Sequence, residues 1–149
     1  MRIIIDADAV PAAVKEVLFR ASARLNIPLV FVANNYQFLP KSELNKMVVV
    51  SSGLDKADDF IAETVCAGEL VITADIPLAA RVIEKEAFAL NPRGFLYTAQ
   101  NVGEKLSLRN FMDEIRGFGT DTGGPAPYSV KHKEAFAKEL DKFLNSHRN

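Results

Sequence analysis

The sequence predicts an α/β fold, a three-layer sandwich with a mostly parallel central sheet. Short, continuous apolar runs, typical of strands buried on both faces, alternate along the chain with segments of helical spacing. Strands that alternate with helices in this way usually form parallel sheets. With 149 residues, the chain has the length of one domain with a sizeable core, and we expect residues 1–149 to form a single domain.

The first elements are predicted to be a strand, a helix and a strand. Residues 2–6 contain three consecutive isoleucines and are typical of a buried strand. Pro11 suits the first helical position, because proline lacks only an N–H that would be unpaired there, so we expect a helix over residues 11–26. Residues 27–34 are a second apolar run and predict a second strand. The polar segment that follows is interrupted by Pro40 and is expected to be a loop.

The middle of the chain continues the alternation. Residues 46–52 predict a third strand. Residues 57–68 have an apolar helical face and end in a glycine, which is common just beyond a helix. Residues 69–75 predict a fourth strand, and the proline at the start of residues 77–87 opens another helix.

The C-terminal part is expected to add a strand and two helices. Residues 94–98 predict the fifth strand, and residues 104–119 have helical spacing. Residues 120–129 are rich in glycine and proline and predict a loop. The last helix is expected from about Val130, with four apolar side chains on one face.

Composition restricts the possible functions. The net charge is −1, so no strong basic field covers the whole chain, although a local basic rim would suffice for nucleic acid. The one cysteine, Cys66, excludes an internal disulfide framework. No apolar run is long enough to span a membrane, and the start of the chain does not resemble a signal peptide. We therefore expect a cytoplasmic protein without a membrane partner.

Aspartates follow three of the predicted strands. In open parallel sheets the functional crevice lies outside the carboxyl ends of the strands. Residues that follow different strands therefore meet at one edge, although they are far apart in the sequence. The aspartates that this rule places at the edge are Asp6, Asp8, Asp55, Asp58, Asp59 and Asp75.

Such a set of carboxylates suits a divalent cation. Carboxylates that lie close together repel one another unless a cation neutralises them. Oxygen ligands favour Mg²⁺ or Mn²⁺, whereas zinc is disfavoured because the sequence lacks a cysteine–histidine cluster. A cation held in this way can activate a water and stabilise the oxygens of a phosphodiester.

Each aspartate also has a purely structural interpretation. Asp6 and Asp75 could be helix caps, and Asp58 and Asp59 could simply complement a helix dipole. We favour a site because the residues gather at the functional edge together. Asp58 borders the apolar stripe of its helix and Asp59 points away from it, so Asp58 is the better ligand and Asp59 a more distant one.

Five motifs, "DADAVP", "GLDKADDFI", "VITADIPLA", "NPRG" and "GGPAP", occur in this order over nearly the whole chain. Together they resemble the YaiI/YqxD family of bacterial proteins, which is similar to the PIN-domain nucleases. The resemblance implies a PIN-like domain whose acidic residues bind Mg²⁺ or Mn²⁺. The catalytic and metal-binding acids would be Asp6, Asp58 and Asp75, and the accessory acids would be Asp8, Asp55 and Asp59.

The leading hypothesis is a metal-dependent nuclease that acts on RNA or single-stranded DNA, with Lys56, Arg81 or Arg93 holding the nucleic-acid backbone. A second hypothesis is a phosphatase of the haloacid-dehalogenase kind, because "DADAV" matches the pattern D-x-D-x-[TV]. In that case Asp6 would be the nucleophile and Asp8 the general acid. A third hypothesis is a non-catalytic PIN-like scaffold that binds a cation, a nucleotide or a partner chain.

Overall fold

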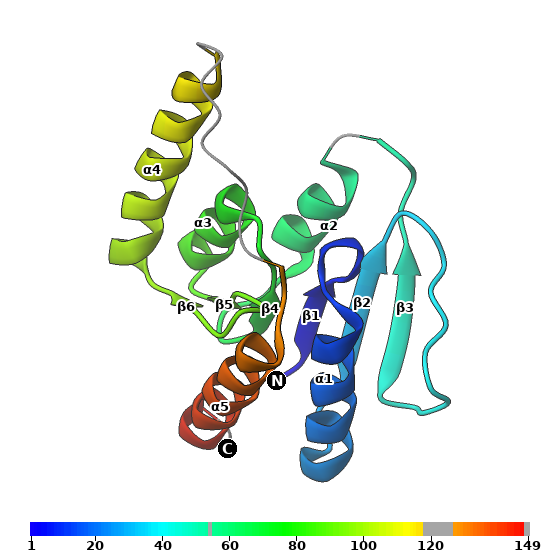
Figure 1. The fold of residues 1–149 in the computed structure, drawn as a ribbon. Helices are drawn as coiled ribbons and strands as arrows, with labels where there is room; N and C mark the ends of the chain where they lie inside the picture. Colours follow the sequence, from blue (N-terminus) through cyan, green and yellow to red (C-terminus); the bar gives the residue numbers. More distant parts are fainter. Residues whose placement is uncertain (54, 118–126, 148–149) are drawn as a thin grey trace.

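The computed structural model describes residues 1–53, 55–117 and 127–147. It is a three-layer α/β sandwich (Figure 1), which confirms the predicted fold class. One sheet has the strand order β3-β2-β1-β4-β5-β6, in which the first five are parallel and β6 is antiparallel to β5. The strands are β1 (Ile3–Asp6), β2 (Leu29–Ala33), β3 (Asn45–Val49), β4 (Leu70–Ile72), β5 (Phe88–Leu90) and β6 (Leu96–Tyr97).

Helices cover both faces of this sheet. Helices α1 and α5 pack on one face, and α2 and α3 on the other, where α4 packs against α3 (Figure 1). A short 3₁₀ helix, η1, links β1 to α1. The helices are η1 (Ala7–Ala9), α1 (Ala12–Leu25), α2 (Lys56–Thr64), α3 (Ile76–Glu84), α4 (Ala99–Gly117) and α5 (Val130–His147).

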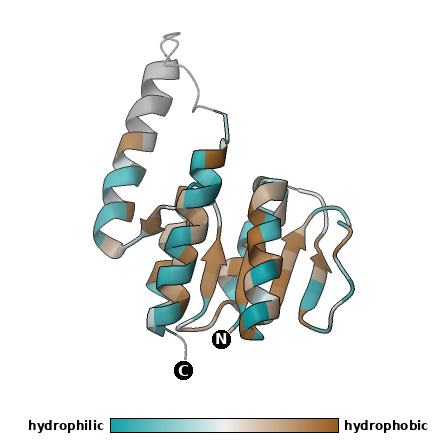
Figure 2. Ribbon diagram, turned by 60° about the horizontal axis from the view of Figure 1, so that its bottom comes forward, coloured by the Kyte–Doolittle hydropathy of each residue, from teal (hydrophilic) through white to brown (hydrophobic). Residues whose placement is uncertain are grey.

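The alternation of side chains along β1 divides the core into two layers. Ile3 and Ile5 pack on the side of α1 and α5, whereas Ile4 packs on the side of α2 and α3. All three are at most 1% exposed, and burying such a side chain contributes about 1.5–3 kcal/mol. The central strands are accordingly hydrophobic, whereas the edge strand β3 begins with polar residues, and the helices carry both polar and hydrophobic residues (Figure 2). Since successive strand residues face opposite sides, Asp6 shares the α2–α3 side with Ile4.

The second and third predicted helices begin and end differently in the structure. Helix α2 ends at Thr64 rather than at Gly68, because Val65 is already extended, with φ −65° and ψ 140°. Gly68 instead takes φ +84° in the turn into β4. Strand β4 ends at Ile72, so the prediction that Asp75 ends this strand is wrong. Asp75 is the N-cap of α3, which starts at Ile76.

The last strands differ more. Strand β5 was missed because three residues are too short to show an alternating pattern. The predicted fifth strand is β6, the antiparallel one. Between them Gly94 has φ +92°, and a Cβ there would lie 2.6 Å from the backbone carbon of Ala135, so only glycine fits without displacement. Helix α4 starts at Ala99, earlier than predicted.

The remaining boundaries agree within a few residues, with Pro11 as the N-cap of α1 rather than its first residue. Of the glycine- and proline-rich loop predicted over residues 120–129, residues 120–126 lie outside the described part of the chain. In the part of the chain that the structure describes, no helix is long and apolar enough to cross a membrane.

Candidate functional site

The site begins where β1 and β4 end side by side. The parallel register pairs Ile5 with Ile72, so the next residues, Asp6 at the end of β1 and Thr73 just after β4, lie side by side. The Thr73 hydroxyl donates a hydrogen bond to Asp6 Oδ2 at 3.0 Å and accepts one from the backbone N–H of Asp75, also at 3.0 Å. Asp6 is only 6% exposed. One threonine thus fixes the positions of two aspartates that are far apart in the sequence.

Asp75 serves as a helix cap. Its Oδ1 accepts a hydrogen bond from the backbone N–H of Leu78 at 2.9 Å, which satisfies one of the free donors at the start of α3. The structural interpretation of Asp75 is therefore correct. The same carboxylate also acts on the groups around it, including Tyr97, whose pKa is raised by burial and then by the charge of Asp75.

Asp58 lies in the first turn of α2 and is partly buried. Burial is the main reason why its pKa rises, from an ordinary 3.8 to about 7, and the negative charges of Asp75 and Asp6 raise it further. A hydrogen bond between the carboxyl groups of Asp58 and Asp75 has the same effect. Asp58 therefore keeps its proton up to about neutral pH.

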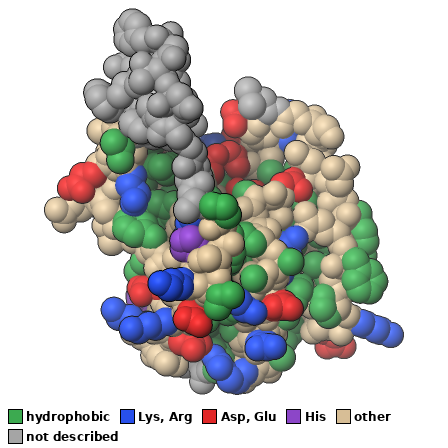
Figure 3. Space-filling view, viewed as in Figure 1, with side chains coloured by type: hydrophobic (Ala, Val, Ile, Leu, Met, Phe, Trp, Pro, Cys, Tyr) green, Lys and Arg blue, Asp and Glu red, His purple; other side chains and the backbone are tan. Residues whose placement is uncertain are grey.

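Asp6 titrates abnormally as well. Its burial raises its pKa, the hydrogen bond from Thr73 lowers it, and the charges of Asp75 and Asp8 raise it again. Asp6, Asp58 and Asp75 therefore form one electrostatic cluster, which we call the acidic cluster. Figure 3 shows acidic side chains gathered at the carboxyl edge of the sheet, towards the top of the view.

Asp59 points away from the acidic cluster. Its Oδ1 lies 2.8 Å from Arg81 Nη1, in an ion pair whose side chains are 51% and 44% exposed. Asp55 is exposed and precedes α2 with a left-handed backbone, φ 62°, and its charge adds slightly to the raised pKa of Asp58. Both residues lie at the expected edge but outside the acidic cluster.

Asp8 holds a loop. It lies in η1 and is exposed, and its Oδ2 accepts a hydrogen bond from the backbone N–H of Asn34 at 2.8 Å. Its Oδ1 accepts a second, longer one from Gln37 Nε2 at 3.3 Å. Both partners belong to the loop between β2 and β3, so Asp8 joins that loop to the end of β1.

Of the three cations that the sequence suggested for substrate binding, Lys56 and Arg81 both lie near Asp59, and Arg93 lies elsewhere. Lys56 and Asp59 line the same groove of about 500 Å³ between α2 and the end of β3. Arg81 is paired with Asp59. Arg93 lies in the turn between β5 and β6, where its Nη1 is 3.3 Å from Nε2 of His132 on α5. The structure therefore does not join them into one basic patch.

The donor set of the acidic cluster consists of carboxylate oxygens, which suits Mg²⁺ or Mn²⁺. Among the side chains that the structure describes, no three of Asp, Glu, His or Cys are already arranged so that they could hold a metal ion. In the described structure, one carboxylate oxygen of Asp6 accepts a hydrogen bond from Thr73, and one of Asp75 accepts a hydrogen bond from the backbone N–H of Leu78. A cation would have to displace the proton of Asp58, and the donor chemistry fits that exchange.

Two polar residues of this edge were not singled out from the sequence. Thr73 could have been found from the strand register, since the residue after Ile72 must lie beside Asp6. Asn34 follows β2, and its buried Oδ1 has no hydrogen-bond partner in the described structure. An asparagine at a strand end gives no pattern by itself, so no sequence signal pointed to it.

Comparisons with known proteins show that the chain is similar to one family of proteins over nearly its whole length. Residues 4–146 match the family model described as "Uncharacterized BCR, YaiI/YqxD family". A "UPF0178 protein" of Syntrophotalea carbinolica is 52% identical over 147 residues, which is 99% of each chain. A relative of the same name from Shewanella piezotolerans is 53% identical over 144 residues, 97% of this chain and 95% of the relative. No solved structure matches the chain.

Proposed function

This chain belongs to the YaiI/YqxD family, and we propose that it is a PIN-like, divalent-metal-dependent nuclease that cleaves RNA or single-stranded DNA. The observation that supports the proposal is the acidic cluster at the carboxyl edge of the parallel sheet. There Asp58 has a pKa of about 7 because it is partly buried and lies beside Asp75 and Asp6. Carboxylates brought together at such cost commonly mark functional sites.

Asp6, Asp58 and Asp75 would hold Mg²⁺ or Mn²⁺, with Asp8, Asp55 and Asp59 further out. When bound, such an ion lowers the pKa of a water and neutralises charge on a phosphodiester. Thr73 orients Asp6, and the cap to Leu78 orients Asp75, so two of the three acids are fixed before any ligand arrives. Fixed ligands need little rearrangement, which favours binding.

Asp58 contributes differently from the other two acids. It holds a proton near neutral pH, and that proton must leave before the carboxylate can act as a ligand. Lys56, Arg81 and Arg93 remain the candidates for contacts to the phosphate backbone. Since they do not form one patch, we expect weak, salt-sensitive binding through these residues alone.

The phosphatase alternative is less well supported. Asp8 would have to donate a proton as a general acid, but its two oxygens accept hydrogen bonds from Asn34 and Gln37. A non-catalytic scaffold remains the second alternative, in which the cluster binds a cation without hydrolysis.

We also propose that the protein works in the cytoplasm, since its composition includes no disulfide framework.

Cleavage of end-labelled single-stranded RNA and DNA oligonucleotides, with Mn²⁺ or with a chelator, tests the proposal. We expect cleavage with Mn²⁺ only, and a loss of at least about 100-fold in Asp6→Asn, because a neutral amide cannot replace a carboxylate ligand. Asp141→Asn is the matched control, since Asp141 lies on α5 in an exposed ion pair with Arg24. Activity that persists in the chelator would contradict the proposal, and a phosphoenzyme trapped on Asp6 would favour the phosphatase.

A further inference from the structure

The loop between β2 and β3 exposes two aromatic rings. Residues 36–40 contain no turn or helix, and the exposure of their side chains alternates. Tyr36 is 72% and Phe38 88% exposed, whereas Gln37 and Leu39 between and after them are partly buried. Leu39 packs against the core on the α1–α5 side. In an extended segment residues two apart share a side, so the two rings face outward together.

This exposure is unusual for such large apolar groups. Burying an aromatic side chain contributes about 1.5–3 kcal/mol, and this segment leaves two aromatic rings exposed while the smaller Leu39 is partly buried. Within the described part of the chain, neither ring lies against another aromatic ring. Single exposed apolar residues are ordinary, but neighbouring rings on an anchored segment indicate a binding surface.

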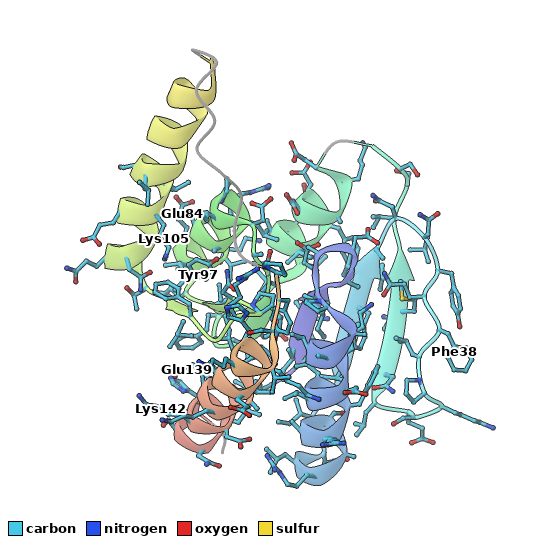
Figure 4. The ribbon with its side chains drawn as sticks, in the orientation of Figure 1. Phe38, Glu84, Tyr97, Lys105, Glu139 and Lys142 are labelled. Carbon is cyan, nitrogen blue, oxygen red and sulfur yellow. The ribbon has the colours of Figure 1, made fainter. Side chains whose placement is uncertain are left out.

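The aromatic segment, defined as residues 36–40, is joined to the acidic site. Gln37 Nε2 lies 3.3 Å from Asp8 Oδ1 and 3.4 Å from the backbone oxygen of Ala7, the residue after Asp6. Lys15 Nζ donates to Gln37 Oε1 at 2.5 Å. Figure 4 shows Phe38 directed away from the body of the molecule on this loop. A ligand lying across the rings can therefore extend to the edge where β1 ends.

The surroundings of the rings suit an unpaired nucleic-acid strand. Rings two residues apart on an extended chain are about 6–7 Å apart along it, at 3.2–3.4 Å per residue. That spacing is close to the distance between successive bases in an extended strand, and every base can stack on an aromatic ring. Lys15, which contacts Gln37, and Lys41 in the loop carry charges that suit phosphates, although Glu43 in the same loop carries the opposite charge.

We propose that Tyr36 and Phe38 form a base-stacking platform that binds single-stranded nucleic acid and leads its backbone towards Asp6, Asp58 and Asp75. The inference rests on the proposed function for what happens at the acidic cluster, but binding at the rings does not require cleavage. A duplex keeps its bases stacked inside and cannot use the platform. The platform therefore selects single strands over duplexes.

The test is binding in excess chelator, which prevents metal-dependent cleavage. Fluorescence anisotropy compares a labelled single-stranded 12-mer with the same strand in a duplex. We expect the double substitution of Tyr36 and Phe38 by serine to weaken single-strand binding at least about 10-fold and duplex binding less than about twofold. Leu108→Ser is the matched control, because Leu108 is 60% exposed on α4, far from this loop, and also loses an apolar surface group.

A second variant reports on stacking directly. The chain contains no tryptophan and three tyrosines, so Phe38→Trp introduces a single tryptophan at the platform, which can be excited selectively at wavelengths that tyrosine does not absorb. We expect this variant to keep the affinity of the unmodified protein and its fluorescence to be quenched by a single strand but not by a duplex. Tight binding by the double serine variant, or unquenched fluorescence during binding, would overturn the platform.

The outcomes separate the two proposals. If the rings are needed for binding but no oligonucleotide is cut with Mn²⁺, the platform stands and the nuclease proposal fails. If oligonucleotides are cut and the serine variant binds and cuts them normally, the nuclease stands and the platform fails. If sedimentation shows a dimer that the serine substitutions dissociate, and single strands do not compete with it, the rings belong to an interface between copies of this chain.

Discussion

Replacing Asp58 by asparagine should stabilise the metal-free protein at alkaline pH. The folded carboxyl has a pKa of about 7 and the unfolded one an ordinary pKa of 3.8. Between these values the folded state holds a proton that the unfolded state has released, so stability falls as the pH rises through this window and is level above about pH 7. Asparagine cannot ionise, so the variant lacks this contribution.

The magnitude follows from the size of the pKa shift. A difference of about three pKa units corresponds to roughly 4 kcal/mol, at about 1.4 kcal/mol per unit. Asp58 is only partly buried, so solvent screening reduces this to about 2 kcal/mol. Part of the loss has already occurred at pH 5. The advantage of Asp58→Asn over the unmodified protein should therefore grow by about 1–2 kcal/mol between about pH 5 and about pH 8.

Urea unfolding in a chelating buffer at the two pH values measures this difference, and the comparison cancels groups that titrate equally in both proteins. Asp59→Asn is the control. Asp59 is in an exposed ion pair with Arg81, worth at most about 1 kcal/mol, and its loss should not change between the two pH values. If the Asp58→Asn advantage is constant or shrinks as the pH rises, the carboxylates do not repel one another, and the electrostatic argument for the acidic cluster is refuted.

Three further predictions follow from the site and the fold. Calorimetric titration should show that Asp58→Ala weakens Mn²⁺ binding at least about 10-fold, whereas Asp59→Ala weakens it less; the reverse order would mean that α2 is oriented differently. Mn²⁺ should raise the melting temperature of the unmodified protein but not of Asp75→Asn, and an intact response would reduce Asp75 to a helix cap. Gly94→Ala should lower the free energy of unfolding by about 2 kcal/mol or more in urea titrations, because its Cβ would overlap the backbone of Ala135 and the backbone φ is positive.

Much of the fold was predictable because several of its elements carry strong sequence patterns. The isoleucine run of β1 and the apolar face of α1 each determine an element without help from the rest of the chain. The short strand β5 is different, since its three residues become a strand only by pairing with β4 and β6. The end of α2 also depends on tertiary contacts, because Glu69 accepts hydrogen bonds from the backbone of Cys66 and from Arg2.

The position of the candidate site at the carboxyl edge of the sheet could be predicted from the sequence, but the contacts between its side chains could not. Because parallel strands end at the same edge of a sheet, the aspartates that follow them were expected to lie at that edge. The alternation of side chains along a strand explains why Asp6 faces α2 and α3 together with Ile4. Which acids approach one another depends on how each helix begins. Asp58 meets Asp75 because α2 and α3 pack side by side, whereas Asp59 lies one residue further around α2 and meets Arg81 instead.

The Asp-Ala-Asp sequence after the isoleucine run divides its two carboxylates between different tasks. Asp6 ends β1 and is buried against Thr73, whereas Asp8 is turned outward by η1. A nucleophile and its general acid would both face one phosphoryl group, but here the second carboxylate accepts hydrogen bonds from the β2–β3 loop. Asp8 therefore connects the acidic cluster to the segment that carries Tyr36 and Phe38. The same short motif that supplies one acid to the cluster thus also fixes the surface on which we propose that the substrate lies.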